Sequence, residues 1–490
     1  MTKYIFLPIY GMVLLILLRY FWGQIGDDSF IFFRYVDHLI NYHSLSWNVL
    51  PSTEPTDMSL YQPVEGYSSP LWLGVLTVAA YFMDVVFAAK LLGALFLTAA
   101  LWRVWQISEQ NTLSMLGAVW GLGVQYWATG GLETSLHAWL FLSLLYVLHS
   151  PPTKNSAIDY ACVALFGLTR PESPAILLIM LFFWKTAWQK KVYLFLPTIC
   201  YFIYRMVVFG DIFPNTYYAK ATGDIFVQLL YGLHYAQSIL ISITCITIFF
   251  WMDTKKIVQS PVFVSQRSIQ SNNLQRIFYV VCAQTAVVVY GGGDWMWFGR
   301  LLVPLYLAIW ALSANYMTGY RVLLCAPLLP LAIPYSMVTH MLQGQTLPVS
   351  AYQEGNLLEV SKNVASAIQE NIPPNAGIAV NHAGALPYYL SAYTILDMSA
   401  LNDPFLAKQE GNVHAKYDAE YVLSQKPSLI VLNSFQQPYK PDYWEGETEL
   451  FQHPSFTKEY VPIQQSWQRI RSGGGYAYIY LFQRRQNIAP

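Results

Sequence analysis

A succession of long apolar stretches fills the first two thirds of this chain and limits what it can fold into. A helix that crosses a membrane needs about 20 mostly apolar residues. Twelve windows of roughly this kind lie near 4–22, 70–83, 85–106, 112–129, 133–149, 157–169, 173–188, 192–209, 233–252, 277–291, 300–318 and 321–341. Only 11% of the 490 residues are charged, whereas soluble domains have about 25%. We therefore expect a polytopic α-helical membrane protein.

Two further counts exclude other classes of protein. Lys and Arg together number 28, as do Asp and Glu, so the chain lacks the basic excess of a nucleic-acid-binding protein. None of the five cysteines has a CxxC or His-paired spacing, and neither a disulfide framework nor a zinc site is expected. No small-residue cleavage site follows the first window, which favours a retained first span over a signal peptide.

The distribution of positive charge predicts how the chain is oriented. Loops with Lys and Arg are expected on the cytoplasmic side, and such loops lie around 185–191, 255–276 and 321. All of these loops can lie on the cytoplasmic side only if one of the early apolar windows does not cross the membrane. The weakest window is 70–83, whose length suits an interfacial or re-entrant helix better than a span. The prediction is then about eleven crossings, with the N-terminus inside and the C-terminus outside.

Two domains follow from this topology. Residues 1–341 form a transmembrane module with an external loop at 23–69, and residues 342–490 form an extracytoplasmic domain. That second domain holds 23 of the 56 charged residues, and its β-prone runs alternate with polar helical stretches, a pattern typical of a small α/β domain. The runs are 377–380, 394–398, 429–432 and 476–482, and the helical stretches include 357–370 and 415–424.

Polar residues at the ends of the apolar windows fall mostly on the external side in this topology. They are Asp27, Asp28, Glu65, Glu133, Arg170, Glu172, Asp211, Asn215, Lys220, Asp294 and Arg300. Ionisable groups near a bilayer are costly, so they usually line a polar cavity or pair with each other. Because these residues come from separate segments, we infer one large external cavity.

The most informative segment is GDDSFIFFRY, which directly follows the first span. Adjacent carboxylates such as Asp27 and Asp28 could act as a general base, bind a metal ion or accept hydrogen bonds from sugar hydroxyls. Alternatively, Asp28 could cap the helix that begins at Ser29. The two interpretations are compatible, because Asp27 could act in chemistry while Asp28 caps.

Further motifs follow in order along the chain. They are PVEGYSSPLW after the first external helix, GLETSLHAWL at 131–140, LTRPES at 168–173, GDIFPNTYYAK at 210–220, GGGDWMWFGRLLVP at 291–304, and NHAGALPYY with ILDMSALNDP at 381–404. Together with GDDSFIFFRY they resemble bacterial GT-C glycosyltransferases, in particular the mycobacterial terminal β-(1→2)-arabinofuranosyltransferase family. The chain departs from that pattern at Asn381-His382, where relatives often have an acid, and at Ser399-Ala400, which replaces Leu-Gly.

The resemblance implies a membrane enzyme of the GT-C type. Such enzymes transfer a sugar from a polyprenyl-phosphate donor to an acceptor outside the bacterial cytoplasmic (inner) membrane, usually with inversion. Here the acceptor would be a glycan or glycolipid of the cell envelope. An acid of the first external loop is then the base that deprotonates the acceptor hydroxyl. By motif position this base is Asp27 or Asp28, and Asp27 is favoured; the adjacent like charge is one route to a raised pKa.

Three basic residues are candidates for binding the donor phosphate: Arg300, Lys220 and Arg170. A guanidinium at position 300 could hold a phosphate bidentately, and the preceding glycines allow a close backbone approach. Alternatively, Arg300 is an interfacial arginine that extends to the membrane surface. Arg170 could equally pair with Glu172 and close a tight turn.

A wider set of polar and aromatic residues is predicted to bind substrate. It comprises Glu65, Tyr67, Glu133, Glu172, Asn215, Tyr217, Asp294, Trp297 and His382. Alternatives stay open: Glu133 could cap the next helix, Trp297 could belong to an interfacial aromatic belt, and His382 could be a satisfied surface residue. Asp403 is expected to cap a helix that begins at Pro404. No metal ligand is assigned, although paired acids leave Mg²⁺ or Mn²⁺ open.

Two other functions compete with glycosyl transfer. A transporter or flippase of a lipid-linked sugar would be expected to show paired repeats and charges in the middle of spans. The charges here gather at one face instead. A non-catalytic sugar-binding scaffold is disfavoured by the Asp27-Asp28 pair.

The predicted topology can be tested by cysteine labelling in intact cells. Ser44→Cys in the external loop and Thr457→Cys in the C-terminal domain should both react with a membrane-impermeant maleimide. Labelling that requires permeabilised cells would contradict the orientation.

Overall fold

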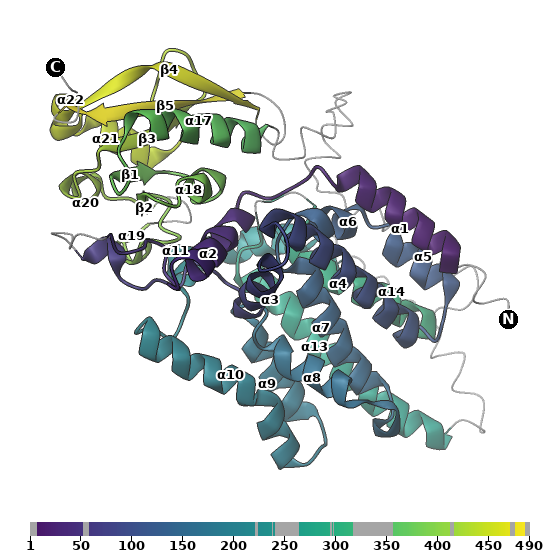
Figure 1. Cartoon of the computed structure of the whole chain (residues 1–490). Helices are drawn as coiled ribbons and strands as arrows, with labels where there is room; N and C mark the ends of the chain where they lie inside the picture. The colour runs from purple at the N-terminus through teal and green to yellow at the C-terminus, as the bar shows by residue number, and fades with distance from the viewer. Residues whose placement is uncertain are drawn as a thin grey trace.

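The structure is a computed structural model that describes residues 7–51, 58–220, 224–237, 239–240, 264–294, 296, 298–316, 356–411, 416–470 and 476–485. Helices from the first two thirds of the chain form one body, and the last third forms a smaller body around a sheet (Figure 1). The predicted domain boundary at 341–342 lies outside the described residues.

The helical body contains most of the apolar windows. Its helices are α1 (Leu7–Phe21), α2 (Ser29–Asn41), α3 (Pro70–Ala80), α4 (Val85–Ile107), α5 (Thr112–Val119), α6 (Leu122–Thr129), α7 (Thr134–His149), α8 (Ala157–Phe166), α9 (Ser173–Phe183), α10 (Trp188–Val208), α11 (Asn215–Lys220), α13 (Val264–Tyr290) and α14 (Val303–Tyr316). At its centre, α4 packs along α7, and α14 packs against both. This packing buries large side chains such as Trp105 and Phe141.

Within the described residues, α4 and α10 are long and apolar enough to cross a membrane, and seven shorter apolar helices accompany them. The count of eleven crossings stays a prediction, because the windows 233–252 and 321–341 lie partly or wholly outside the described residues. The window 112–129 is not one helix: α5 and α6 are separated at Gly121, whose backbone is extended with φ −68° and ψ 107°.

Side-chain caps explain where two of these helices begin. Ser69 accepts a hydrogen bond from the Trp72 amide at 3.3 Å, and Pro70 occupies the first position of α3. Asp84 accepts from the Phe87 amide at 2.9 Å and starts α4. Both arrangements satisfy amides that a helix leaves unpaired at its N-terminus. The resulting α3 has 11 residues, too few to span a hydrocarbon core.

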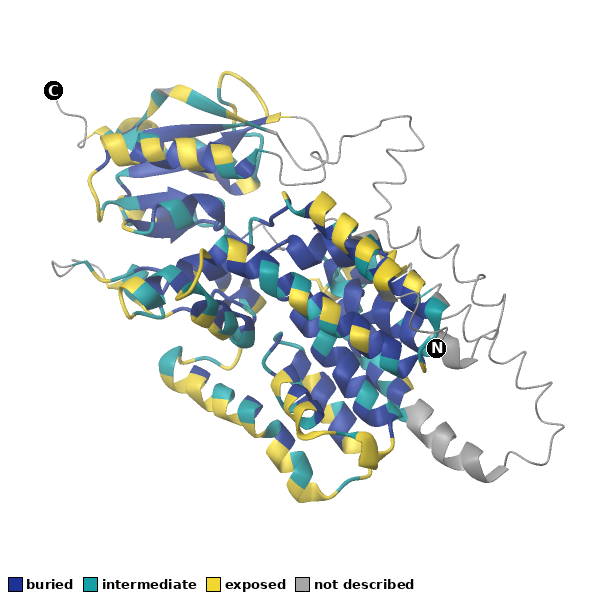
Figure 2. Ribbon diagram, turned by 45° about the vertical axis from the view of Figure 1, so that its right-hand side comes forward, coloured by how far each residue is buried: buried dark blue, intermediate teal, exposed yellow. Residues whose placement is uncertain are grey.

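Helix α10 differs from α4 in how much of it the protein covers. Only 17% of its apolar window is buried, compared with 44% for α4, and exposed residues follow its length in Figure 2. They include Leu196, Ile203 and Val207. Apolar side chains without a protein partner are favourable only against an apolar solvent, so α10 has the surface of a lipid-facing helix.

The smaller body is a five-stranded sheet with helices packed around it. Its strands are β1 (Gly377–Val380), β2 (Thr394–Asp397), β3 (Leu429–Ser434), β4 (Tyr460–Ile470) and β5 (Tyr476–Arg484), and the order is β2-β1-β3-β5-β4. The first three strands are parallel, whereas β5 is antiparallel to β3 and β4. The helices are α17 (Leu357–Asn371), α18 (Ala385–Tyr389), α19 (Pro404–Ala407), α20 (Ala419–Ser424), α21 (Glu445–Gln452) and α22 (Pro454–Glu459).

The four predicted β-prone runs are strands, and the stretch 357–370 is a helix, as expected. Strand β4 was not predicted, because its sequence YVPIQQSWQRI lacks a clear apolar run. It forms because β5 supplies an antiparallel partner along its length, for example Trp467 opposite Ile479. Asp403 caps α19 by accepting from the amides of Phe405 and Leu406, which confirms that prediction.

One arginine of α2 joins the two bodies. Arg34 is fully buried and donates to the carbonyl oxygens of Pro387, Leu390 (3.1 Å) and Tyr393 (3.0 Å), all from the segment around α18. Its Nε donates to the Trp47 carbonyl at 3.0 Å, and its guanidinium lies 4.9 Å from the Trp47 ring centroid. Burial lowers the Arg34 pKa to about 9. The cation is therefore held by carbonyl dipoles.

Two asparagines extend this junction. The Asn48 side chain accepts from the Ile395 amide at 2.8 Å and donates to the Ile395 carbonyl at 3.0 Å. It thus occupies the place of a neighbouring strand at the β2 edge of the sheet. Asn215, at the start of α11, donates to the carbonyls of Ala400 and Leu401 at 2.9 and 2.8 Å. Residues far apart in the sequence therefore position the sheet domain on the helical body.

We expect Arg34→Ala to destabilise the protein by about 3 kcal/mol or more, because several buried carbonyls lose their donor. Thermal unfolding of the full-length protein in detergent measures this loss. Lys408→Ala is the control, since Lys408 is an exposed partner of Asp211 and such pairs contribute about 1 kcal/mol or less. Equal stability of the two variants would contradict the assigned role of Arg34.

Candidate active site

The turn between α1 and α2 brings Asp27 and Asp28 to the junction of the two bodies. The Gly26 amide donates to the Gly130 carbonyl at 2.9 Å. Gly131 has φ +85°, and a Cβ there would approach the Ser29 side chain to 2.9 Å. The GDDS turn therefore lies directly against the turn before α7, which requires glycine both for its positive φ and for space.

Asp28 does not cap α2. It occupies the N-cap position, but its backbone is helical and its side chain accepts no hydrogen bond from the helix, so the capping interpretation is wrong. Its carboxylate lies instead in the electrostatic field of Lys220 and Arg300. Burial raises the Asp28 pKa and the two cations oppose that rise.

Asp27 faces the C-terminal domain. Its Oδ1 accepts a hydrogen bond from the Ala385 amide at 2.9 Å, and a Cβ on Gly384 would collide with its carboxylate. Burial raises the pKa of Asp27, while Arg469 on β4 and the Ala385 amide lower it. The two adjacent acids thus have different partners: cations of the helical body for Asp28, and the segment before α18 for Asp27.

Arg300 is positioned by an unusual turn. Phe298 and Gly299 both have positive φ, 59° and 58°. The Arg300 Nε lies 2.8 Å from Asp294 Oδ2, but neither atom has hydrogen-bond geometry toward a described partner. Charge therefore holds this pair, without an aligned hydrogen bond. The guanidinium also lies 5.6 Å from the Trp127 ring centroid, and Trp297 lies outside the described residues.

Arg170 is paired on two sides. It donates to Glu172 at 2.6 Å and also to Glu133, so the alternative in which Arg170 and Glu172 pair is the observed one. Glu133 does not cap α7 through its side chain. Electrostatic interactions connect Arg170 and Glu133 with Arg300. The structure therefore brings Asp28, Asp294, Lys220 and Arg300 together with Arg170, Glu133 and Glu172.

Other predicted substrate residues form a second group. Glu65 accepts from Arg205 at 2.5 and 3.0 Å and from the Tyr201 hydroxyl at 2.6 Å, and the Tyr67 hydroxyl lies 3.4 Å from that of Tyr201. Arg205 was not predicted as a site residue, although a lone arginine inside an apolar window is itself a signal of function.

Three predicted substrate-binding residues belong neither to the charged residues around Arg300 nor to the group around Glu65. Asn215 binds backbone carbonyls of the C-terminal domain, as described above. Tyr217 is 37% exposed and stacks on Phe213 at 4.4 Å between ring centroids. His382 lies in the C-terminal domain, where its Nδ1 is 2.8 Å from Asn381 Oδ1. Burial and the nearby Arg469 lower the His382 pKa to about 3, so the ring is neutral.

Comparison with solved structures gives the fold of the whole chain. The crystal structure of ArnT from Cupriavidus metallidurans in the apo state superposes with a TM-score of 0.56 at 12% identity, covering 100% of both chains. ArnT bound to undecaprenyl phosphate gives 0.57 at 11% identity, covering 99% of both. The chain has the ArnT fold. The match includes the C-terminal sheet domain, because it covers the whole chain.

Sequence comparisons add little to this. A family model described as a domain of unknown function (DUF8728) matches residues 350–481, which include strands β1 to β4 and the first part of β5. No curated protein matches the chain. The finer resemblance to terminal arabinofuranosyltransferases stays a prediction.

Metal binding was left open by the sequence. Among the residues that the structure describes, no three His, Cys, Asp or Glu side chains are grouped so as to hold a metal ion. Asp27 and Asp28 have separate partners, as described above. A role for Mg²⁺ or Mn²⁺ stays an untested prediction.

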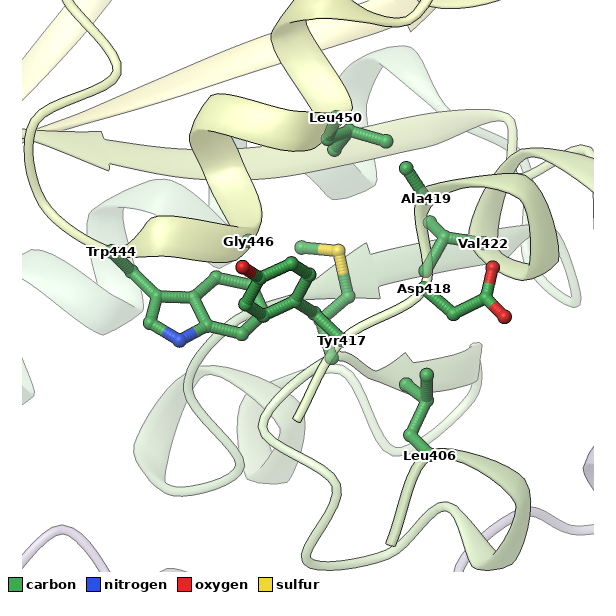
Figure 3. A pocket seen from close by; sticks show the side chains of 9 residues that line it. Leu406, Tyr417, Asp418, Ala419, Val422, Trp444, Gly446 and Leu450 are labelled. Atoms are coloured by element: carbon green, nitrogen blue, oxygen red, sulfur yellow. The ribbon is translucent and has the colours of Figure 1, made fainter. Parts of the chain in front are cut away.

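A small, partly open pocket of about 10 Å³ lies in the C-terminal domain, and none of the predicted site residues lines it (Figure 3). Its lining is Met398, Leu406, Tyr417, Asp418, Ala419, Val422, Trp444, Gly446 and Leu450. The Tyr417 and Trp444 rings meet edge to face at 5.6 Å. The Asp418 carboxylate accepts from the Tyr421 amide at 2.8 Å as the cap of α20. The space is therefore mainly an apolar gap between packed elements.

A buried carboxyl group organises the C-terminal ends of β1 and β3. Glu447 on α21 is fully buried; it accepts from the Asn433 amide at 3.0 Å and from the Asn381 side chain. Burial raises its pKa to about 8, so it is protonated in the folded protein at neutral pH. The sequence offered no signal for this residue, because EGETE reads as a solvated helix.

We expect Glu447→Gln to stabilise the protein at high pH. The folded-state pKa lies above the unfolded value of about 4.3, so wild-type stability falls as pH rises from there through about 8. Glutamine retains the acceptor for Asn433 and does not titrate. At pH 9 the variant should be more stable by at least about 1.4 kcal/mol, the equivalent of one pKa unit.

Melting temperatures of the full-length protein in detergent from pH 5 to pH 9 measure this effect. Glu445→Gln, at an exposed position of the same helix, should follow the wild-type curve. A Glu447→Gln curve that also follows the wild type would show that Glu447 is ionised in the folded state.

Proposed function

We propose that this protein is an integral membrane glycosyltransferase that transfers a sugar from a polyprenyl-phosphate donor to a glycan or lipid of the cell envelope. Its fold is that of ArnT, a GT-C glycosyltransferase that depends on a lipid-linked sugar, and one ArnT structure holds undecaprenyl phosphate. The proposed location is the bacterial inner membrane, with the reaction on the periplasmic side.

The observation that carries this proposal is the separation of partners at the Asp27-Asp28 pair. Asp28 lies in the field of Lys220 and Arg300, the two cations proposed to bind a phosphate. Asp27 lies against the C-terminal domain. A donor phosphate on one side and an acceptor hydroxyl on the other would thus meet at adjacent residues of one turn.

Lys220 and Arg300 would bind the phosphate of the donor in this reaction. Lys220 ends α11, and its side chain is exposed, so its ammonium group can reach an anion. The Arg300 guanidinium retains donors beyond the Nε that faces Asp294. Charge-assisted hydrogen bonds from both cations would stabilise the phosphate as it leaves with the electron pair of the broken C–O bond.

Asp27 would be the general base. It would take the proton of the acceptor hydroxyl while the hydroxyl oxygen forms a bond to the anomeric carbon, and the bond to the phosphate oxygen breaks. A single displacement of this kind inverts the anomeric configuration. The raised pKa of Asp27 supports this role, because a base is most effective when its pKa is near the working pH.

We expect Asp27→Asn to lower transfer by roughly 10²- to 10⁴-fold, the contribution typical of a general base. Asparagine retains an oxygen for the Ala385 amide, so folding should be unchanged. The assay follows transfer from radiolabelled polyprenyl-phosphate sugar to an envelope extract.

Asp37→Asn is the matched control for this experiment, since Asp37 lies on α2 and contacts Asn41 at 2.8 Å. It should retain full activity. Wild-type turnover in Asp27→Asn would exclude Asp27 as the base, and a large loss only in Asp28→Asn would transfer the role to its neighbour.

A further inference from the structure

The connections of the C-terminal sheet diverge at the carboxyl ends of its parallel strands. From β1 the chain passes to β2 on one side, and β3 then pairs with the other side of β1. In parallel sheets a crevice opens where the connections diverge in this way, and ligands bind there. In this domain the corresponding position lies beyond Val380 and Ser434, the last residues of β1 and β3.

Side-chain amides with defined orientations line this end of the sheet. Asn433 donates to Asn381 Oδ1 at 2.6 Å and lies 3.2 Å from His382 Nδ1. Glu447 accepts from Asn381 and from the Asn433 amide. The buried carboxyl group thus orients the Asn381 side-chain amide, and the Asn381 oxygen in turn accepts from the Asn433 side chain.

Three rings continue outward from these amides; we call His382, Tyr443 and Phe435 the aromatic row. The His382 and Tyr443 ring centroids are 5.6 Å apart, with 3.3 Å between Nε2 and the hydroxyl. The Tyr443 and Phe435 centroids are 4.8 Å apart, and Phe435 is 36% exposed. The row therefore ends at a partly exposed ring.

The loop that carries two of these rings is tied at its base. Asp442 accepts from the Phe435 amide at 2.8 Å, the Ser434 hydroxyl at 3.1 Å and the Gln436 side chain at 2.9 Å. The Tyr480 hydroxyl donates to the Gln436 carbonyl at 3.1 Å. Because both ends of the loop are held, Phe435 and Tyr443 keep a fixed relation to each other.

The inner end of the aromatic row precedes, in the chain, the backbone that contacts Asp27. His382 precedes Gly384 by two residues, and the Gly384-Ala385 backbone contacts the Asp27 carboxylate. Arg469 acts electrostatically on both Asp27 and His382. A ligand on the row would therefore extend toward the acid that faces this domain.

We propose that the aromatic row is a subsite for the acceptor, and that it binds sugar units of a glycan chain next to the unit that reacts. Ring faces stack on the apolar faces of sugars. The side-chain amides of Asn381, which is half-buried, and Gln436, which is exposed, lie beside the row and match their hydroxyl groups. This inference rests on the proposed function, because it assigns the acceptor side of that same reaction. It also gives the C-terminal domain a role in choosing the acceptor.

The test measures binding of oligosaccharides to the full-length protein in lipid nanodiscs. The probe is the neutral oligosaccharide fraction released from the cell envelope of the native host and labelled with a fluorophore. Phe435→Ala and Tyr443→Ala should each weaken retention of these oligosaccharides roughly 10-fold or more, the loss expected when a buried aromatic contact is removed. Phe405→Ala should not, although Phe405 is also exposed and stacked on another ring.

Binding of undecaprenyl phosphate to the same preparations separates the two proposals. Wild-type protein that binds undecaprenyl phosphate but retains no oligosaccharide would overturn the acceptor subsite alone. Equal retention by wild type, Phe435→Ala and Tyr443→Ala would also overturn it. Failure of the wild type to bind undecaprenyl phosphate would instead overturn the proposed function.

Discussion

The buried guanidinium of Arg34 is the interaction on which the rest of this structure depends. It donates to carbonyls around α18 in the C-terminal domain and to the carbonyl of Trp47 in the segment that follows α2. Burying a charge is costly unless its hydrogen bonds are made, so the arrangement is stable only when both bodies are in place. Asp27 and Asp28 precede α2 directly, and Gly384 and Ala385 lie six and five residues before Leu390. The contact between Asp27 and the Gly384-Ala385 backbone therefore follows from the position of Arg34.

The charges of the helical body divide into paired and available groups. Arg205 is neutralised by Glu65, and Arg170 lies between two glutamates. Arg300 has one carboxylate beside it without an aligned hydrogen bond, and Lys220 is exposed at the end of α11. Residues that already have full ion pairs maintain the shape of the site. Lys220 and Arg300, near Asp28, have fewer partners. A phosphate could therefore bind them without breaking existing ion pairs.

Motif positions predicted much of the candidate site, but they did not predict the partners of each residue. Asp28 looked like a helix cap because it precedes Ser29, yet the nearby Lys220 and Arg300 draw its carboxylate elsewhere. Glu65 and Arg205 are 140 residues apart, and nothing local in either segment indicates the other. Arg34 and Asn48 were invisible as a junction, because carbonyl partners leave no mark in the sequence. Strand β4 depends in the same way on a partner strand.

The sequence by itself determined the membrane class, the α/β character of the C-terminal domain and the gathering of acids and bases at the ends of apolar windows. These properties depend on hydropathy, propensity and capping, which act over a few residues. Only the tertiary structure decided that Asp27 faces the C-terminal domain while Asp28 faces Lys220 and Arg300. The same holds for the aromatic row, which joins residues after β1 and β3. Which residue each buried charge or amide contacts depends on how segments far apart in the sequence pack against each other.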